Sequence, residues 1–120
     1  MEKFDLLSGI DENTATATAA ATATATQAAP GPGSQLFITG FSFSVSTVPS
    51  TVGTLQIRRN GGATILKRFI LPASAVAAII YEFKRPIRIP DNQDADIIFA
   101  GLGTGVGQVE LYTVTRPTTV

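Results

Sequence analysis

The 120-residue chain contains no cysteine, no histidine and no tryptophan. Without cysteine it has no disulfide, no zinc–thiolate site and no thiolate nucleophile, so the fold depends on its apolar core. Without histidine it lacks the usual general base near neutral pH and the commonest metal ligand, and neither a Ser–His–Asp nor a Cys–His arrangement can be built. These absences predict a protein that is not an enzyme and holds no cofactor.

Long hydrophobic runs are also missing. The longest apolar-leaning stretch, residues 69–81, has 13 residues and contains Pro72 and Ser74, and it is too short to cross a bilayer. The N-terminal sequence MEKFDLLSGIDE is acidic and lacks the apolar segment of a secretory signal. We therefore expect a soluble protein with no membrane partner.

The chain is formally neutral, yet its charges are segregated. Residues 1–13 carry four acids against one base, and residues 91–96 carry three aspartates and no base. Between them, residues 58–88 carry one acid and seven bases: Arg58, Arg59, Lys67, Arg68, Lys84, Arg85 and Arg88. Such segregation favours contacts with a complementary surface on another subunit or partner, and solvated strand edges and loop tips are the alternative. Overall neutrality and core-like aromatic positions predict no nucleic-acid binding.

The pattern of turns and short β-rich runs predicts one all-β domain. In FSFSVS, Phe41 and Phe43 share one face of a strand and the serines share the other. Asn60-Gly61-Gly62 predicts a tight antiparallel hairpin. The expected strands are 35–46, 54–59, 63–71, 76–85, 96–101 and 108–116, with a proline-bracketed edge piece at 87–89. With the N-terminal strand described next, about seven or eight strands would form an antiparallel β-sandwich or jelly roll.

Residues 13–27 read NTATATAAATATATQ, which is either a low-complexity linker or a strand with two faces. Alanine holds every odd position from 15 to 25 and threonine holds the even ones, apart from Ala20. This unbroken period of two favours a strand with a thin alanine face packed against protein and a threonine face that tolerates water. A strand over 14–26 would be overlong, so it must bend, at residues 19–21, or extend past its sheet.

Two other stretches resemble ligand-binding motifs. GLGTGVG (101–107) follows a strand, but a nucleotide-binding turn is followed by a helix, and here a strand comes next, so we expect a flexible hairpin turn. DNQDAD (91–96) clusters three carboxylates but lacks EF-hand spacing, so a solvated turn is favoured over a calcium site.

The chain divides into an N-terminal arm, residues 1–13, and a β-sandwich domain, residues 14–120. The arm is too short for an autonomous helix and we expect it to be ordered where it touches a neighbouring subunit. Together with the basic segment it supplies the candidate partner-binding residues: Phe4, Leu6, Leu7, Ile10, Arg58, Arg59, Lys67 and Arg68.

The order of motifs resembles a known group of proteins. The Thr/Ala strand is followed by AAPGPG, LFITGFSFSV, the NGG hairpin, RPIRIPDNQDADIIFAGLGTG and VELYTVTRP. Over residues 14–117 this resembles small β-sandwich proteins of tailed bacteriophages, and among them the capsid decoration (cement) proteins. The resemblance implies a virion protein on the capsid surface, often a homotrimer, whose partner is the major capsid protein and which bridges capsid subunits and stabilises the shell.

Two other classes of function remain open. A receptor- or glycan-binding module of a phage tail or fibre is the second, and exposed aromatic residues in loops would favour it. An enzyme is the third, and it would need a carboxylate pair such as Asp94 and Glu110 in one cleft.

Overall fold

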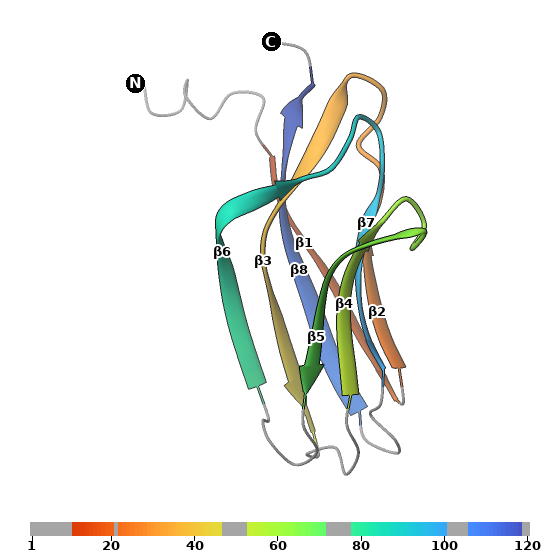
Figure 1. Cartoon of the computed structure of the whole chain (residues 1–120), viewed down its shortest axis with the longest axis vertical. Helices are drawn as coiled ribbons and strands as arrows, with labels where there is room; N and C mark the ends of the chain where they lie inside the picture. Colours follow the sequence, from red (N-terminus) through yellow and green to blue (C-terminus); the bar gives the residue numbers. More distant parts are fainter. Residues whose placement is uncertain (1–10, 21, 47–52, 72–77, 101–105, 119–120) are drawn as a thin grey trace.

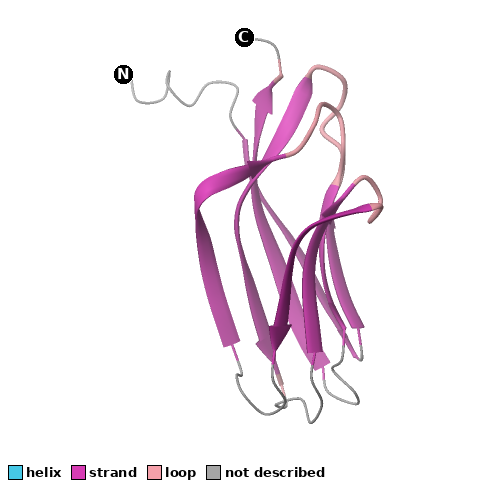
Figure 2. Cartoon of the chain, in the orientation of Figure 1, coloured by secondary structure: helices cyan, strands magenta, loops and turns pink. Residues whose placement is uncertain are grey.

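A computed structural model describes residues 11–20, 22–46, 53–71, 78–100 and 106–118, and every regular element in these ranges is a strand (Figure 2). No helix among the described residues is long and apolar enough to span a membrane. The strands are β1 (Asp11–Ala20), β2 (Thr22–Gln27), β3 (Ser34–Val45), β4 (Gly53–Arg59), β5 (Thr64–Leu71), β6 (Ala78–Arg88), β7 (Ala95–Ala100) and β8 (Val106–Pro117).

The strands form two antiparallel four-stranded sheets (Figure 1). Sheet A has the order β1-β8-β3-β6 and sheet B has the order β2-β7-β4-β5. Most connections pass from one sheet to the other, and the resulting order is that of an eight-stranded jelly roll. The predicted fold class, an antiparallel β-sandwich of jelly-roll type, is therefore confirmed.

The threonine–alanine stretch supplies a strand to each sheet. β1 pairs with β8 in sheet A and β2 pairs with β7 in sheet B, so the chain changes sheets between Ala20 and Thr22. This position lies within the predicted bend. Ala23 and Ala25 are buried, and the remaining described alanines of β1 pack partly buried against the core, whereas all six threonines are exposed. The prediction of a two-faced strand is confirmed, and the linker alternative is excluded.

The core lies between the two sheets and follows the alternation of the strands. Phe43 of β3 and Phe99 of β7 meet across the layers with ring centroids 4.3 Å apart. Leu55 and Ile57 of β4 are fully buried, as the alternating pattern of residues 54–59 predicts. β7 is the most continuously buried strand, also as expected.

A β-bulge interrupts β3 between Ile38 and Gly40. Thr39 is the additional residue, and its hydroxyl donates a hydrogen bond to the carbonyl oxygen of Tyr112 at 3.2 Å. A Cβ at Gly40 would collide with the carbonyl oxygen of Tyr81 on β6. Glycine at this position therefore allows β6 to pair closely with β3.

The turns follow the glycine and asparagine signals where the structure describes them. Asn60, Gly61 and Gly62 have φ values of 57°, 66° and 86°, and they join β4 to β5 in the predicted hairpin. The segment 87–89 is not a separate piece, because β6 continues through Pro86 to Arg88. Proline is tolerated here because β6 is the edge strand of sheet A and residues 83–86 have no register partner in β3.

Several strand limits differ from the prediction by a few residues, and one predicted connection is wrong. β1 begins at Asp11 and not at residue 14, because the register with β8 extends to Asp11–Thr115. The hairpin expected at GLGTGVG is wrong: residues 101–105 lie outside the described ranges, but β7 belongs to sheet B and β8 to sheet A, so they cannot form a hairpin. Local turn chemistry marks where the chain turns but does not determine which sheet the next strand joins.

Candidate functional site

The outer face of sheet A carries short polar side chains in register across three strands. Thr16 of β1 lies opposite Glu110 of β8, which lies opposite Ser42 of β3. The neighbouring rows repeat this pairing, and alternation directs all these side chains away from the core. We call this surface the hydroxyl face and define it by the residues Thr14, Thr16, Thr18, Ser42, Ser44, Gln108, Glu110 and Tyr112.

Glu110 is the carboxylate among these eight residues and is the centre of a hydrogen-bond network. Its Oε1 accepts hydrogen bonds from the Ser42 hydroxyl at 2.8 Å and from the Tyr112 hydroxyl at 2.9 Å. Its Oε2 accepts one from the Gln108 amide at 3.4 Å. The hydrogen bonds from Ser42 and Tyr112 favour the charged form and lower the pKa of Glu110.

The same network acts on Tyr112. Its interaction with Ser42 lowers the pKa of the phenol, but partial burial and the neighbouring Glu110 carboxylate outweigh this effect, so the pKa of Tyr112 is raised. Tyr112 therefore stays protonated as a donor, and Glu110 stays ionised as an acceptor. The two groups fix the geometry of the face, and neither is suited to transfer a proton near neutral pH.

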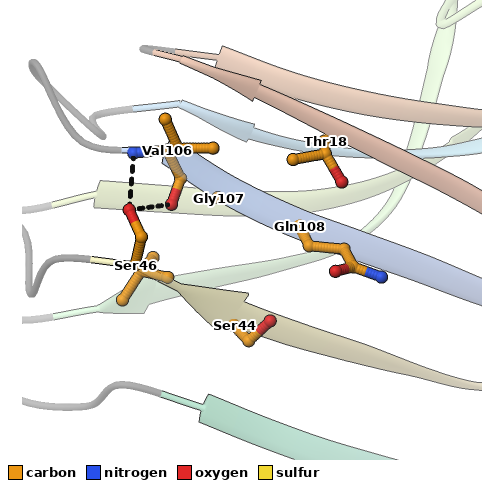
Figure 3. A pocket seen from close by; sticks show the side chains of 7 residues that line it. Thr18, Ser44, Ser46, Val106, Gly107 and Gln108 are labelled. Carbon is orange, nitrogen blue, oxygen red and sulfur yellow. Dashed lines mark hydrogen bonds between the residues drawn. The ribbon is translucent and has the colours of Figure 1, made fainter.

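Two shallow hollows lie along the hydroxyl face, one towards each end of β8. The first, about 260 Å³, is lined by Thr18, Ser44, Val45, Ser46, Val106, Gly107 and Gln108. Figure 3 shows the side chains of Ser44, Ser46 and Gln108 around it, with Ser46 bonded to the backbone of Val106 at its end. The second, about 350 Å³, is lined by Glu12, Asn13, Thr14, Thr39, Tyr112, Thr113 and Val114.

One residue that lines the hollow near Tyr112, Thr113, carries an unusual buried group on its side chain. The Thr113 side chain is 1% exposed and its hydroxyl has no hydrogen-bond partner within the described part of the chain. Thr113 points inward with Val109 and Leu111, so the hydroxyl lies on the core side of β8. An unpaired buried hydroxyl costs stability and does not by itself define a site.

The three aspartates of DNQDAD contact different elements and hold loops in place. Asp91 accepts hydrogen bonds from the Gly33 backbone N–H at 3.0 Å and from the Thr118 hydroxyl at 2.5 Å. Asp94 accepts one from the Gly61 N–H at 2.7 Å. Asp96 pairs with Arg58. Among the described residues no group of three acids or other metal-ligating side chains gathers in one place.

The predicted partner-binding residues are spread over different parts of the fold. Arg58 and Arg59 of β4 have partners within the chain: Arg58 makes a two-point contact with Asp96 at 2.8 and 3.0 Å, and Arg59 donates to Gln93 at 2.6 Å. Lys67 and Arg68 are exposed on β5, one of the two edge strands of sheet B. The arm candidates lie outside the described residues: Phe4, Leu6, Leu7 and Ile10.

The carboxylates considered for an enzyme have separate contacts. Asp94 bonds to the β4–β5 turn, and Glu110 bonds to Ser42 on the outer face of sheet A. The hydroxyl face itself did not emerge from the sequence as a site. Its signals were present as the threonines of 14–18, the serines of FSFSVS and the polar positions of QVELYT, but only the register of β1, β8 and β3 brings them together.

No protein-family model and no curated protein sequence matches this chain. Solved structures do share its fold. A chain in the acid-stable capsid structure of Helicobacter pylori bacteriophage KHP30 is 11% identical, with 86% of each chain covered and a TM-score of 0.54.

Two further structures have lower TM-scores. A subunit of the disulfide-linked pili that form Bacillus endospore appendages is 17% identical over 90% of this chain and 86% of its own, with a TM-score of 0.47. The C-terminal CBM6 of LamC from Zobellia galactanivorans is 8% identical over 88% of this chain and 100% of its own, with a TM-score of 0.48. The class defined here is a jelly-roll β domain whose fold also occurs within a phage capsid structure.

Proposed function

We propose that this protein is a structural virion component that binds the outer surface of a phage capsid and stabilises the shell by bridging major capsid subunits. The hydroxyl face carries this proposal. It is a broad polar surface, mostly of short hydroxyl side chains, with a shallow hollow towards each end, which suits an extended protein contact better than an enclosed small ligand. The fold that this protein shares with a chain of the KHP30 capsid structure also supports the proposal of a structural virion role.

A bridging role requires no chemical turnover. This agrees with the Glu110 and Tyr112 network, in which the pKa of Glu110 is lowered and the pKa of Tyr112 is raised. The protein acts on the shell as a homo-oligomer, with a trimer favoured. A trimer on a local three-fold position of a capsid gains avidity from contacts that are individually weak. Bridged subunits then resist the pressure of packaged DNA.

The test is co-sedimentation of the purified protein with capsids of the phage that encodes it, after accessory proteins have been removed. Thr18→Arg places a long cation at the hollow between Thr18, Ser44 and Gln108, and we expect it to weaken capsid binding by about tenfold or more. Thr24→Arg is the matched control, because Thr24 is also exposed but lies on β2 in the other sheet. If both variants bind capsids as tightly as the unchanged protein, the hydroxyl face is not part of the capsid interface.

A second candidate is a receptor- or glycan-binding module of a phage tail or fibre, acting through the same face. Tyr112 favours it, because an aromatic ring beside Glu110 and Gln108 offers a stacking surface together with hydrogen-bonding groups. The test is binding of the purified protein to a glycan array. Binding that Tyr112→Ala abolishes, in a protein that does not bind capsids, would establish this candidate instead.

A further inference from the structure

The two sides of the sandwich differ in how they are closed. On one side β1 and β2 follow each other with a single residue between them and join sheet A to sheet B; β5 and β6 are also consecutive in the chain, but residues 72–77 separate them. On the other side β6 ends sheet A and β5 ends sheet B, and no ladder joins them. β5 pairs with β4 and β6 pairs with β3, so each has one unpaired edge within the described part of the chain. Such edges are open to strand addition.

Aromatic side chains of the core reach the surface between β5 and β6. Phe69 of β5 lies 5.4 Å from Phe41 and 6.2 Å from Tyr81, measured between ring centroids. Tyr81 and Phe83 of β6 are 5.1 Å apart. Tyr81 is 45% exposed and the other two are half-buried. We call this gap, lined by Phe69, Tyr81 and Phe83, the aromatic seam.

The strands that border the aromatic seam are cationic and apolar. β5 and β6 together carry five bases against the single acid Glu82. Four of these bases are exposed and contact no carboxylate among the described residues: Lys67, Arg68, Lys84 and Arg85. Ile70 and Ile80, on the outer faces of the two strands, are 68% and 79% exposed. Exposed apolar side chains favour an apolar partner surface, and cations without carboxylate partners favour an acidic one. A segment that binds the aromatic seam should therefore carry both apolar and acidic side chains.

Residues 1–10 have this chemistry. The segment MEKFDLLSGI carries Glu2 and Asp5 and the apolar residues Phe4, Leu6, Leu7 and Ile10. In an extended chain Phe4, Leu6 and Ile10 share one side with Glu2, whereas Asp5 and Leu7 lie on the other. We propose that residues 1–10 of one copy lie along the aromatic seam of a second copy, with Phe4, Leu6 and Ile10 on Phe69, Tyr81 and Phe83 and the acids beside Lys67 and Arg68.

Reach favours a second copy over the same chain. Asp11 pairs with Thr115 at the far edge of sheet A, while Tyr81 lies on the row Tyr81–Phe41–Leu111–Ala15. Three strand spacings across and four residues along separate the two positions by about 19 Å. From Asp11, an extended chain takes Leu7 no further than about 14 Å and Leu6 about 18 Å. The segment of the same chain could bring Phe4 and, at its limit, Leu6 to the seam, but not Leu7 and Ile10 with them, whereas a second copy can place the whole segment along it.

The first experiment is a charge exchange, read by sedimentation equilibrium of the full chain at low salt. The unchanged protein should self-associate. Lys67→Glu with Arg68→Glu, and separately Glu2→Lys with Asp5→Lys, should each weaken association by about tenfold or more. The two pairs combined in one chain should restore it. Circular dichroism melting of each variant confirms that the exposed substitutions leave the fold intact. A monomer at all concentrations, or association indifferent to every charge reversal, would overturn the proposal.

The second experiment uses the absence of natural cysteine. Chains carrying Leu6→Cys are mixed with chains carrying Lys67→Cys and oxidised, and a disulfide-linked heterodimer is expected. Thr24→Cys, on β2 at the opposite edge of sheet B, is the matched control and should cross-link much less. When one chain carries both substitutions, an intrachain disulfide in dilute solution would place the segment on its own seam and contradict exchange between copies. None of these outcomes depends on capsid binding, so this proposal and the proposed function can fail separately.

Discussion

Arg58 and Asp96 form a two-point ion pair across β4 and β7 on the outer face of sheet B. The Arg58 Nε and Nη2 donate to the two carboxylate oxygens at 2.8 and 3.0 Å. The two residues are register partners in the ladder, and the Asp96 side chain is 7% exposed. A cation that the sequence offered as a partner-binding residue is therefore used within the fold, because a buried carboxylate requires a charged partner.

Arg58→Met should lower the free energy of unfolding by about 2 kcal/mol, because Asp96 is left nearly buried without its cation. Urea denaturation at neutral pH measures the loss. The control is Arg59→Met, which removes a hydrogen bond to the neutral amide of Gln93 and should cost under about 1 kcal/mol. Arg58→Met combined with Asp96→Asn should recover part of the loss, and full additivity of the two substitutions would contradict a coupled pair.

Glu110 should contribute a stability that depends on pH. Its folded pKa lies below the unfolded value of about 4.3, so the contribution is complete above that pH and is lost as the pH falls through the folded pKa. The advantage of the unchanged protein over Glu110→Gln should be under about 1 kcal/mol near pH 7, because the face is open to solvent, and it should shrink below about pH 4. Thermal melting between pH 3 and pH 7 tests this.

The pH dependence should diminish in Ser42→Ala, because the Ser42 hydrogen bond is the largest cause of the lowered pKa. If the unchanged protein instead gained stability over Glu110→Gln as the pH fell, the pKa of Glu110 would be raised on folding and not lowered, and this account would be excluded.

Thr113→Val should stabilise the protein by about 1 kcal/mol, because it removes a buried hydroxyl without a partner and keeps the branched shape of the side chain. The measurement is the urea midpoint at unchanged slope. Thr39→Val is the comparison: its hydroxyl donates to the Tyr112 carbonyl oxygen, so its loss should be neutral or destabilising. A destabilised Thr113→Val would mean that the hydroxyl has a partner after all.

Gly40→Ala should destabilise by about 1–3 kcal/mol, because the new methyl group meets the backbone of Tyr81 and cannot be accommodated by a rotamer change. The strain falls on the pairing of β6 with β3, so amide protons of β6 should exchange faster while those of β4 and β7 in the other sheet change little. Uniform loss of protection in both sheets would show instead that β6 does not open separately.

The sequence predicted strand positions well because alternation is local. Phe41 and Phe43 face inward with a serine between them, and the described alanines at odd positions face inward with threonines outward, as their parity requires: Ala15, Ala17, Ala19, Ala23 and Ala25. Because a single strand of that length exceeds an ordinary sheet, the sequence left two alternatives, a bend within 19–21 or a strand extending past its sheet, and the change of sheets between Ala20 and Thr22 agrees with the first. What could be derived was therefore the face of each residue and the rough limits of each strand.

The candidate site could not be derived in the same way. Thr16, Glu110 and Ser42 are separated by long stretches of sequence, and only their register on three strands makes them neighbours. Likewise, nothing near GLGTGVG states that β7 and β8 belong to different sheets. Pairing between distant strands is decided by the packing of the whole core, which a single sequence does not display.

The threonine–alanine crossing also gives the sandwich a mechanical asymmetry. Because β1 passes directly into β2, tension applied to one sheet on that side is transmitted to the other through covalent bonds. On the side of β5 and β6 the covalent connection is longer, residues 72–77, and among the described residues the two strands also meet through ring contacts among Phe41, Phe69 and Tyr81. The two sheets are therefore held together most closely at the alanine strands β1 and β2, and under load we expect them to separate first at the aromatic seam.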